Sequence, residues 1–163
     1  MRGTEQGEFV EFYARESNSV RRYARAILGG AAFDLDDVMQ EAWTKAWRAW
    51  DSAAPERRRA WMFRIVRNCC LDRHRRRGPT MEVQVAKDDL SAGDDPLVAR
   101  VEATTAVLLI EALSRPLRDT LYLRVVEERS YDEIASILAV PIGTVMSRLY
   151  AARQIVARKM GPR

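Results

Sequence analysis

Apolar residues recur at helical spacing in two blocks of the chain, separated by a stretch that lacks this period. In the first block the spacing predicts helices at residues 7–29, 34–50 and 60–77. Asp34 stands where the second of them would begin and is a candidate N-cap. Helical spacing resumes at Leu97 and continues to the C-terminus, and no run of useful length alternates with the period of a strand. The pattern therefore predicts an all-α fold.

The stretch between the blocks reads PTMEVQVAKDDLSAGDDP, residues 79–96, and combines acidic residues with turn formers. This composition is typical of a flexible linker. We therefore expect two small helical domains, residues 1–78 and 97–163, joined by an acidic linker.

The last block contains the signature of a helix-turn-helix. Ser130 and Glu133 form an S-x-x-E capping box that would start a short helix, and Pro141 suits the first turn of the next one. The second helix of such a pair can enter a DNA major groove. Its expected core face is Val145, Leu149, Ala152 and Val156, and its expected free face is Met146, Ser147, Tyr150 and Gln154. The alternative is an ordinary helical hairpin with a solvated face.

The predicted helix at residues 60–77 carries an aromatic and polar stripe opposite Phe63, Val66 and Cys70. The stripe is Trp61, Arg64, Asn68, Asp72 and Arg75. A ring, an amide and guanidinium groups along one line suit unstacked bases and a single-stranded backbone. Further arginines and His74 surround it, so the positive charge of the chain is concentrated here. The alternative is a core tryptophan with arginines that only solvate the helix.

The predicted helix at residues 34–50 has a broad apolar arc, in which Trp43, Trp47 and Trp50 are expected to be core residues. The remaining arc is polar and consists of Asp37, Gln40, Glu41, Thr44 and Arg48. It is either a protein-binding surface or simply a wetted face.

Composition narrows the function classes. The 163 residues include 27 Lys and Arg against 23 Asp and Glu, with a pI of about 9.4, which is compatible with a polyanionic partner. No stretch of apolar residues is long enough for a membrane span or a secretory signal, so a cytoplasmic protein without membrane insertion is expected. Cys69 and Cys70 are adjacent, which predicts core fillers rather than a disulfide or metal pair. Catalytic groups, metal sites and cofactors are not predicted.

Three segments together resemble the small extracytoplasmic-function group of bacterial RNA polymerase sigma factors, in the sigma-70 family. They are DLDDVMQEAWTKAWRAWD, AWMFRIVRNCCLDRHRRR and YDEIASILAVPIGTVMSRLYAAR, in that order, and the resemblance covers nearly the whole chain. It implies a two-domain factor that binds core polymerase through the β and β′ subunits, recognises promoter DNA and opens it. We further expect regulation by a separate anti-sigma factor, because the polymerase-binding surfaces would otherwise remain available.

The resemblance carries roles to matching positions. It implies that Asp37, Gln40, Glu41, Thr44 and Arg48 face the clamp helices of the largest polymerase subunit. It places Trp61, Arg64, Asn68, Asp72, Arg75 and Arg76 at the minus-ten element, with residues 51–59 resembling a loop that captures a flipped base. It places Thr144, Met146, Ser147, Arg148, Tyr150 and Arg153 at the minus-thirty-five element.

Some positions depart from the family pattern. Ala139 stands where Gly is frequent, and a left-handed alanine would cost about 1 kcal/mol. Met146 and Ala151 stand where basic residues are usual, which weakens the expected polar readout and leaves the promoter sequence open. A stand-alone helix-turn-helix regulator remains the alternative, although it gives no reason for the stripe at residues 61–75 or for the polar arc at residues 37–48.

Overall fold

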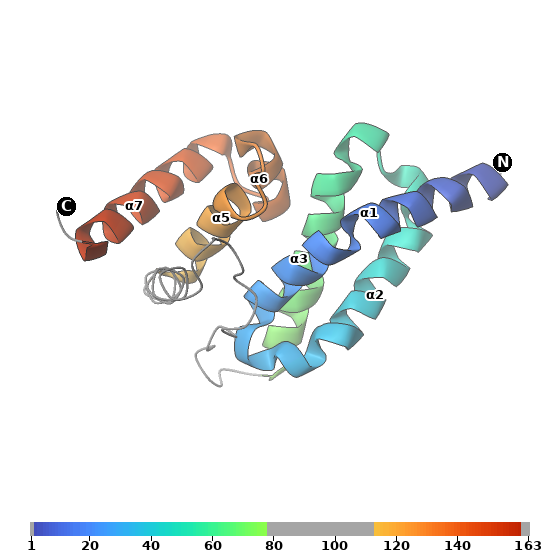
Figure 1. Ribbon diagram of the computed structural model, residues 1–163, viewed down its shortest axis with the longest axis horizontal. Coiled ribbons are helices and arrows are strands. Elements are labelled where there is room, and N and C mark those ends of the chain that lie inside the picture. The colour runs from blue at the N-terminus through green and yellow to red at the C-terminus, as the bar shows by residue number, and fades with distance from the viewer. Residues whose placement is uncertain (1, 78–112, 161–163) are drawn as a thin grey trace, which may run out of the picture. The chain divides into compact units, whose positions relative to one another are not determined.

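The computed structural model describes residues 2–77 and 113–160, and every regular element in these ranges is a helix. The chain divides into two compact units, residues 1–83 and 84–163 (Figure 1). The all-α prediction is confirmed for the described residues. The predicted linker at residues 79–96 lies outside them.

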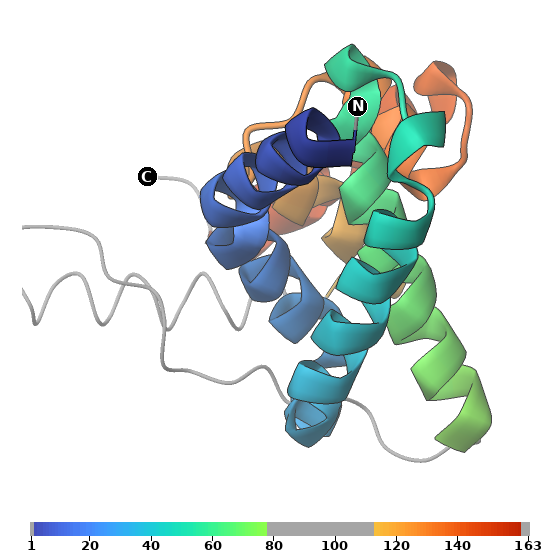
Figure 2. The same cartoon turned by 90° about the vertical axis from the view of Figure 1, so that its right-hand side faces the viewer.

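The first unit is a bundle of three helices joined by short 3-10 turns. Its helices are α1 (Arg2–Leu28), α2 (Leu35–Arg48) and α3 (Arg58–Arg77), and its turns are η1 (Gly29–Asp34), η2 (Trp50–Ser52) and η3 (Pro55–Arg57). Each helix packs against the other two (Figure 2). The helix that was expected at residues 7–29 starts earlier and runs without a break through the polar residues ESNS.

Two groups of side chains form the core of this unit. In the first group, Tyr23 of α1 and Phe63 of α3 are both buried, with ring centroids 5.2 Å apart. The second group is an aromatic cluster that joins Phe9 and Phe12 of α1 to Trp50, with centroid distances of 5.1 and 5.2 Å. Cys69 and Cys70 are buried free thiols, as their predicted role of core fillers requires.

Asp34 occupies the N-cap position of α2, as predicted, but its side chain does not cap the helix. Its backbone is already helical, with φ −86° and ψ −1°, and its side chain makes no capping hydrogen bond. Because η1 leads directly into α2, the carboxylate turns toward α3 instead, where Oδ2 lies 2.6 Å from Nη2 of Arg77. The Arg77 guanidinium also lies over the ring of Phe33, 4.0 Å from its centroid. Asp34 therefore fastens the end of α3 to the turn between α1 and α2.

The second unit contains α5 (Arg115–Val125), α6 (Tyr131–Leu138) and α7 (Ile142–Met160). Its described core is apolar and consists of Leu113, Leu123, Ile134, Ile137, Leu138, Val145, Leu149 and Ala152. Arg129 is buried in the connection between α5 and α6, with its guanidinium 3.8 Å from Glu133 Oε1 and 3.9 Å from Glu127 Oε2. This charged cluster fixes the point at which α6 begins.

Within the described ranges, no single helix is both long and apolar enough to cross a membrane. The pair α6 and α7 reaches that length and hydropathy only when taken together, and the two helices are bent by 102° at their turn.

Candidate functional site

The polar arc predicted on α2 lines a shallow hollow at the surface of the first unit. The hollow has a volume of about 330 Å³ and is lined by Asp37, Gln40, Glu41, Thr44, Lys45 and Arg48. All five predicted residues of this surface therefore lie together, and all are exposed except Glu41, which is half-buried. Thr44 donates its hydroxyl proton to the Gln40 carbonyl at 2.7 Å, so its oxygen faces outward mainly as an acceptor.

Lys45 is part of the same hollow and was missed in the sequence. Its Nζ lies 2.7 Å from Glu41 Oε1 and 3.6 Å from Cys69 Sγ, so it links the polar surface of α2 to α3. The hydrogen bond to Glu41 raises the pKa of Lys45. Burial raises the pKa of the Cys69 thiol. The i, i+4 spacing of Glu41 and Lys45 was the signal that could have found this pair.

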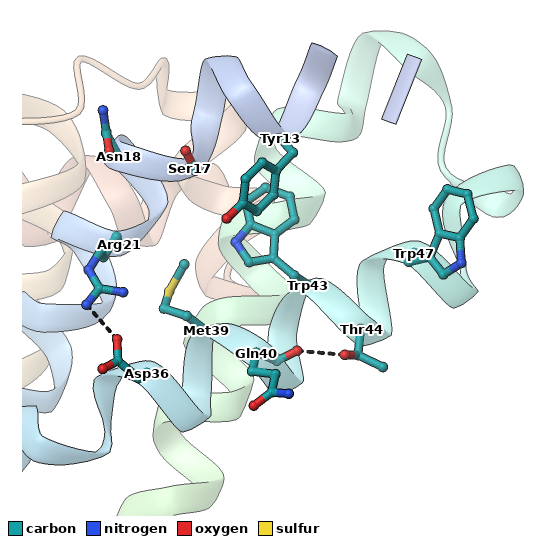
Figure 3. Close-up of a pocket in the computed structure, with 10 residues that line it drawn as sticks. All are labelled: Tyr13, Ser17, Asn18, Arg21, Asp36, Met39, Gln40, Trp43, Thr44 and Trp47. Carbon is teal, nitrogen blue, oxygen red and sulfur yellow. Dashed lines mark hydrogen bonds and ion pairs between the residues drawn. The ribbon is translucent and has the colours of Figure 1, made fainter. Parts of the chain in front are cut away.

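A groove of about 590 Å³ runs beside this hollow, between α1 and α2 (Figure 3). Gln40 and Thr44 line both hollows. Tyr13 and Trp47 stand at the groove with 47% of each side chain exposed, and the ion pair of Arg21 and Asp36, at 2.6 Å, crosses it.

The prediction that Trp47 is a core residue is wrong. Its ring touches Phe9 edge-on with centroids 4.9 Å apart, while the rest of its surface lies open in the groove. The helical period placed Trp47 on the apolar side of α2, but α1 contacts its ring through Phe9 and leaves nearly half of the residue exposed. The position is therefore at the rim of the core.

The predicted stripe on α3 lies along one side of that helix. Arg64, Asn68 and Arg75 are exposed, and Trp61 and Asp72 are half-buried. The Trp61 ring has its centroid 6.4 Å from that of buried Trp50, so one side of it packs on the aromatic cluster and the other remains accessible. Arg75 and Asp72 form an ion pair within the stripe, and Arg76 is exposed beside it.

Several arginines of the basic run hold the bundle together. Arg58 Nη1 lies 3.0 Å from Glu8 Oε2, and the Arg58 guanidinium covers the Trp50 ring at 4.0 Å. Arg59 Nε lies 2.9 Å from Oε2 of Glu16, a carboxylate whose side chain is only 4% exposed. Part of the predicted concentration of positive charge is therefore neutralised, because acidic residues of α1 face the start of α3.

His74 also has a structural contact. Its Nε2 lies 3.1 Å from the carbonyl oxygen of Ile27, near the end of α1, and the ring is half-buried. The predicted surface histidine thus helps to terminate α1.

The helix-turn-helix of the second unit forms as predicted. The Ser130 hydroxyl accepts a hydrogen bond from the Glu133 amide at 3.2 Å, and the Ser130 amide donates to the Glu133 carboxylate at 2.9 Å. Ala139 ends α6 in the left-handed conformation, with φ 54°. The 102° bend between α6 and α7 lies in the range of helix-turn-helix pairs.

The predicted DNA-facing residues of α7 are on its accessible side. Met146, Ser147, Tyr150 and Arg153 are exposed, and Thr144 and Arg148 are half-buried. On the opposite side Val145, Leu149 and Ala152 are fully buried as expected, whereas Val156 is half-buried. The two sides of α7 are thus divided between packing and solvent as the sequence predicted.

In the described ranges, no group of three or more His, Cys, Asp or Glu side chains is placed to hold a metal ion. The arrangement presents three surfaces instead: the polar hollow on α2, the stripe on α3 and the accessible side of α7.

Comparison with known protein families gives two matches in chain order. The family model "Sigma-70 region 2" matches residues 12–80, and "Sigma-70, region 4" matches residues 106–156. The hollow on α2 and the stripe on α3 lie within the first match, and the helix-turn-helix lies within the second.

Individual proteins give the same result. The ECF RNA polymerase sigma-E factor of Escherichia coli (strain K12) is 32% identical over 143 residues, which cover 79% of this chain and 75% of that protein. A solved structure of CnrH in complex with the cytosolic domain of CnrY is 26% identical, with a TM-score of 0.68 over 95% of this chain and 88% of that chain. The sigma factor RpoE of Bartonella quintana, solved with the anti-sigma factor NepR, shares the fold at 24% identity. Its TM-score is 0.75 over 94% of this chain and 96% of that one.

Proposed function

Because this chain belongs to the extracytoplasmic-function group of RNA polymerase sigma factors, which direct promoter-specific transcription initiation, we propose how its three surfaces share that task. Sigma factors bind core RNA polymerase and promoter DNA. In our proposal the chain catalyses no reaction of its own and acts in the cytoplasm, where it supplies DNA recognition to the polymerase.

The polar hollow on α2 binds core polymerase. Asp37, Gln40 and Arg48 offer an acceptor, an amide and a guanidinium on one exposed surface, and Glu41 is already oriented by Lys45. Charged groups that are already oriented at the edge of an interface contribute more to the specificity of association than to its affinity. The largest subunit of the polymerase, through its clamp helices, is the proposed partner of this hollow.

The stripe on α3 binds the opened minus-ten element. Trp61 offers one accessible ring surface for base stacking, and Arg64 and Asn68 are exposed next to it. Stacking on an aromatic side chain stabilises an unstacked base by about 1–3 kcal/mol, which offsets the cost of taking a base out of the duplex. The accessible side of α7 binds the closed minus-thirty-five element in the major groove.

The observation that carries this proposal is the presence of both sigma-70 regions, in order, in one chain whose accessible surfaces fall within them. Two weak contacts on one polymerase-bound chain reinforce each other because the second binds at high effective concentration. A stand-alone regulator would leave the hollow on α2 and the stripe on α3 without a use.

The test is in vitro transcription with bacterial core polymerase and the full chain on a randomised promoter library. We expect initiation at defined sites only when the chain is present. Asn68→Ala should reduce DNA opening more than polymerase binding, and the double change Asp37→Ala with Gln40→Ala should reduce polymerase binding. Gln6→Ala with Glu11→Ala removes an exposed amide and acid from α1 and is the matched control.

Two results would contradict the proposal. Tight footprinting of duplex promoter DNA by the chain without polymerase would favour the stand-alone regulator. Equal loss of polymerase binding and DNA opening in every variant would indicate damage to the fold instead of separate surfaces.

We also propose that an anti-sigma protein controls the chain by covering its polymerase-binding surface. The hollow on α2 and its neighbouring groove are open on the described unit, so a separate protein can bind them. Chain isolated from unstressed cells should carry an inhibitor that competes with core polymerase. Constant activity with and without stress, and no co-purifying inhibitor, would count against this proposal.

A further inference from the structure

The accessible side of α7 carries an apolar stripe along its centre. Ile142, Met146 and Tyr150 follow one another at four-residue spacing, which makes them neighbours on a helix surface. Their side chains are 43%, 53% and 68% exposed, respectively. The exposed side of α7 thus includes an apolar stripe, in addition to the apolar residues of its packed side.

Polar groups at the centre of this surface are few. The Ser147 hydroxyl donates its proton to the Thr144 carbonyl at 3.0 Å, so the serine faces outward as an acceptor. Ala151 follows Tyr150 and adds no donor. The cations Arg153, Arg158 and Lys159 are exposed further along the helix.

The cations and the geometry favour duplex DNA over an apolar protein surface as the occupant. α7 is bent by 102° relative to α6 and has exposed residues along most of its length, as a helix that enters a major groove requires. Exposed arginine and lysine side chains toward its end complement the phosphates on either side of the groove.

We propose that Met146, with Ile142 and Tyr150 beside it, reads the methyl groups of thymines in the minus-thirty-five element. Thymine is the one standard base that presents a methyl group in the major groove, whereas the others present only donors and acceptors. The methionine thioether is at most a weak hydrogen-bond acceptor. It therefore favours thymine through contact with the methyl group and disfavours bases whose donors and acceptors it would leave without a hydrogen bond. This inference rests on the proposed role of α7 as the minus-thirty-five reader.

The test replaces thymine by deoxyuridine, which removes only the methyl group. The minus-thirty-five element is first selected from the randomised library with holoenzyme made from the full chain and core polymerase. Each thymine in it is then replaced singly. We expect about a fourfold loss of holoenzyme affinity at one or more positions, the change that burial of one methyl group produces.

Two variants of similar volume assign that loss to Met146. Met146→Leu should retain the preference for thymine over deoxyuridine, and Met146→Gln should abolish it at the same position. Because Met146 is exposed, both should match the parent in thermal unfolding.

Each outcome has a distinct meaning. Equal affinity for thymine and deoxyuridine at every position overturns the proposal. So does weaker binding of Met146→Gln to core polymerase without DNA, combined with an unchanged thymine preference, because the apolar stripe would then contact protein. Absence of promoter-specific initiation with any template would overturn the proposed function itself.

Discussion

The two helices proposed to contact DNA, α3 and α7, differ in what their arginines do. On α3, Arg58, Arg59, Arg75 and Arg77 pair with acidic residues of the same unit. Between described residues, no ion pair involves an arginine of α7. A basic run in a sequence is therefore a poor measure of the charge offered to DNA, because part of it stabilises the fold. The arginines of α7, although fewer, are thus not engaged in ion pairs between described residues.

The side chains proposed to contact bases, Trp61 on α3 and Met146 on α7, differ as well. Trp61 of α3 is half-buried against Trp50 and offers one surface of a ring that is already fixed. Met146 of α7 is exposed and flexible. A fixed ring suits the face of an unstacked base, and a flexible apolar side chain suits the edge of a paired one.

The largest expected effect tests the ring on α3. Trp61→Ala should reduce open-complex formation by about 10- to 100-fold, because it removes a stacking surface worth about 1–3 kcal/mol. Permanganate reactivity of thymines in the minus-ten element measures the opening. Trp61→Phe keeps a ring and should retain most of the activity. Similar losses in both variants would contradict base stacking as the role of Trp61.

The second prediction separates a structural arginine from a DNA-binding one. Arg59→Ala should lower the free energy of unfolding of the first unit by about 1–2 kcal/mol, because buried Glu16 loses a guanidinium partner. Arg64→Ala should leave stability unchanged and make the dependence of promoter binding on salt shallower by about one ion.

Fluorescence during urea unfolding reports on the first unit alone, since all four tryptophans lie between residues 43 and 61. Salt titration of holoenzyme on promoter DNA gives the second measurement. If Arg59→Ala and Arg64→Ala changed both quantities equally, the distinction between the two kinds of arginine would fail.

The third prediction concerns the turn that positions α7. Ala139→Gly should raise the stability of the second unit by about 0.5–1 kcal/mol, because glycine adopts a positive φ without the strain of alanine. Ala151→Gly, in the middle of α7, should instead lower it by about 1 kcal/mol. Hydrogen exchange of peptides from α6 and α7 measures both. Destabilisation by both glycines would show that the turn is not strained by Ala139.

Sequence reasoning was most reliable where local chemistry decides the structure. The capping box at Ser130 and Glu133 and the two sides of α7 form as predicted, since helical period and a terminal serine suffice to specify them. It was less reliable where tertiary contacts decide. Asp34 pairs with Arg77 across the unit, and α1 covers only part of Trp47. Neither the ion pair of Asp34 nor the exposure of Trp47 can be read from the helical period of the sequence. The groove between α1 and α2 likewise depends on how two helices pack.

The smallest expected effect is a pH dependence on the packed side of α3. Burial raises the pKa of Cys69, and the hydrogen bond to Glu41 raises that of Lys45. The native unit therefore keeps protons that the unfolded chain releases above about pH 8.5 for a thiol and about 10.4 for a lysine. This contribution to stability is complete below those values and is lost as the pH rises through the native pKa values.

The free energy of unfolding of the first unit should thus be flat from about pH 7 to 8 and decline toward pH 10, as followed by tryptophan fluorescence. Cys69→Ala should make the decline shallower. Lys45 contacts the Cys69 thiol, so the variant also removes that partner of the lysine. The same slope in Cys69→Ala and in the parent would assign the alkaline sensitivity to other groups. In that case the contact between Lys45 and Cys69 would not contribute to the pH dependence. The ion pairs and the ring of Trp61 would then remain as the differences between α3 and α7.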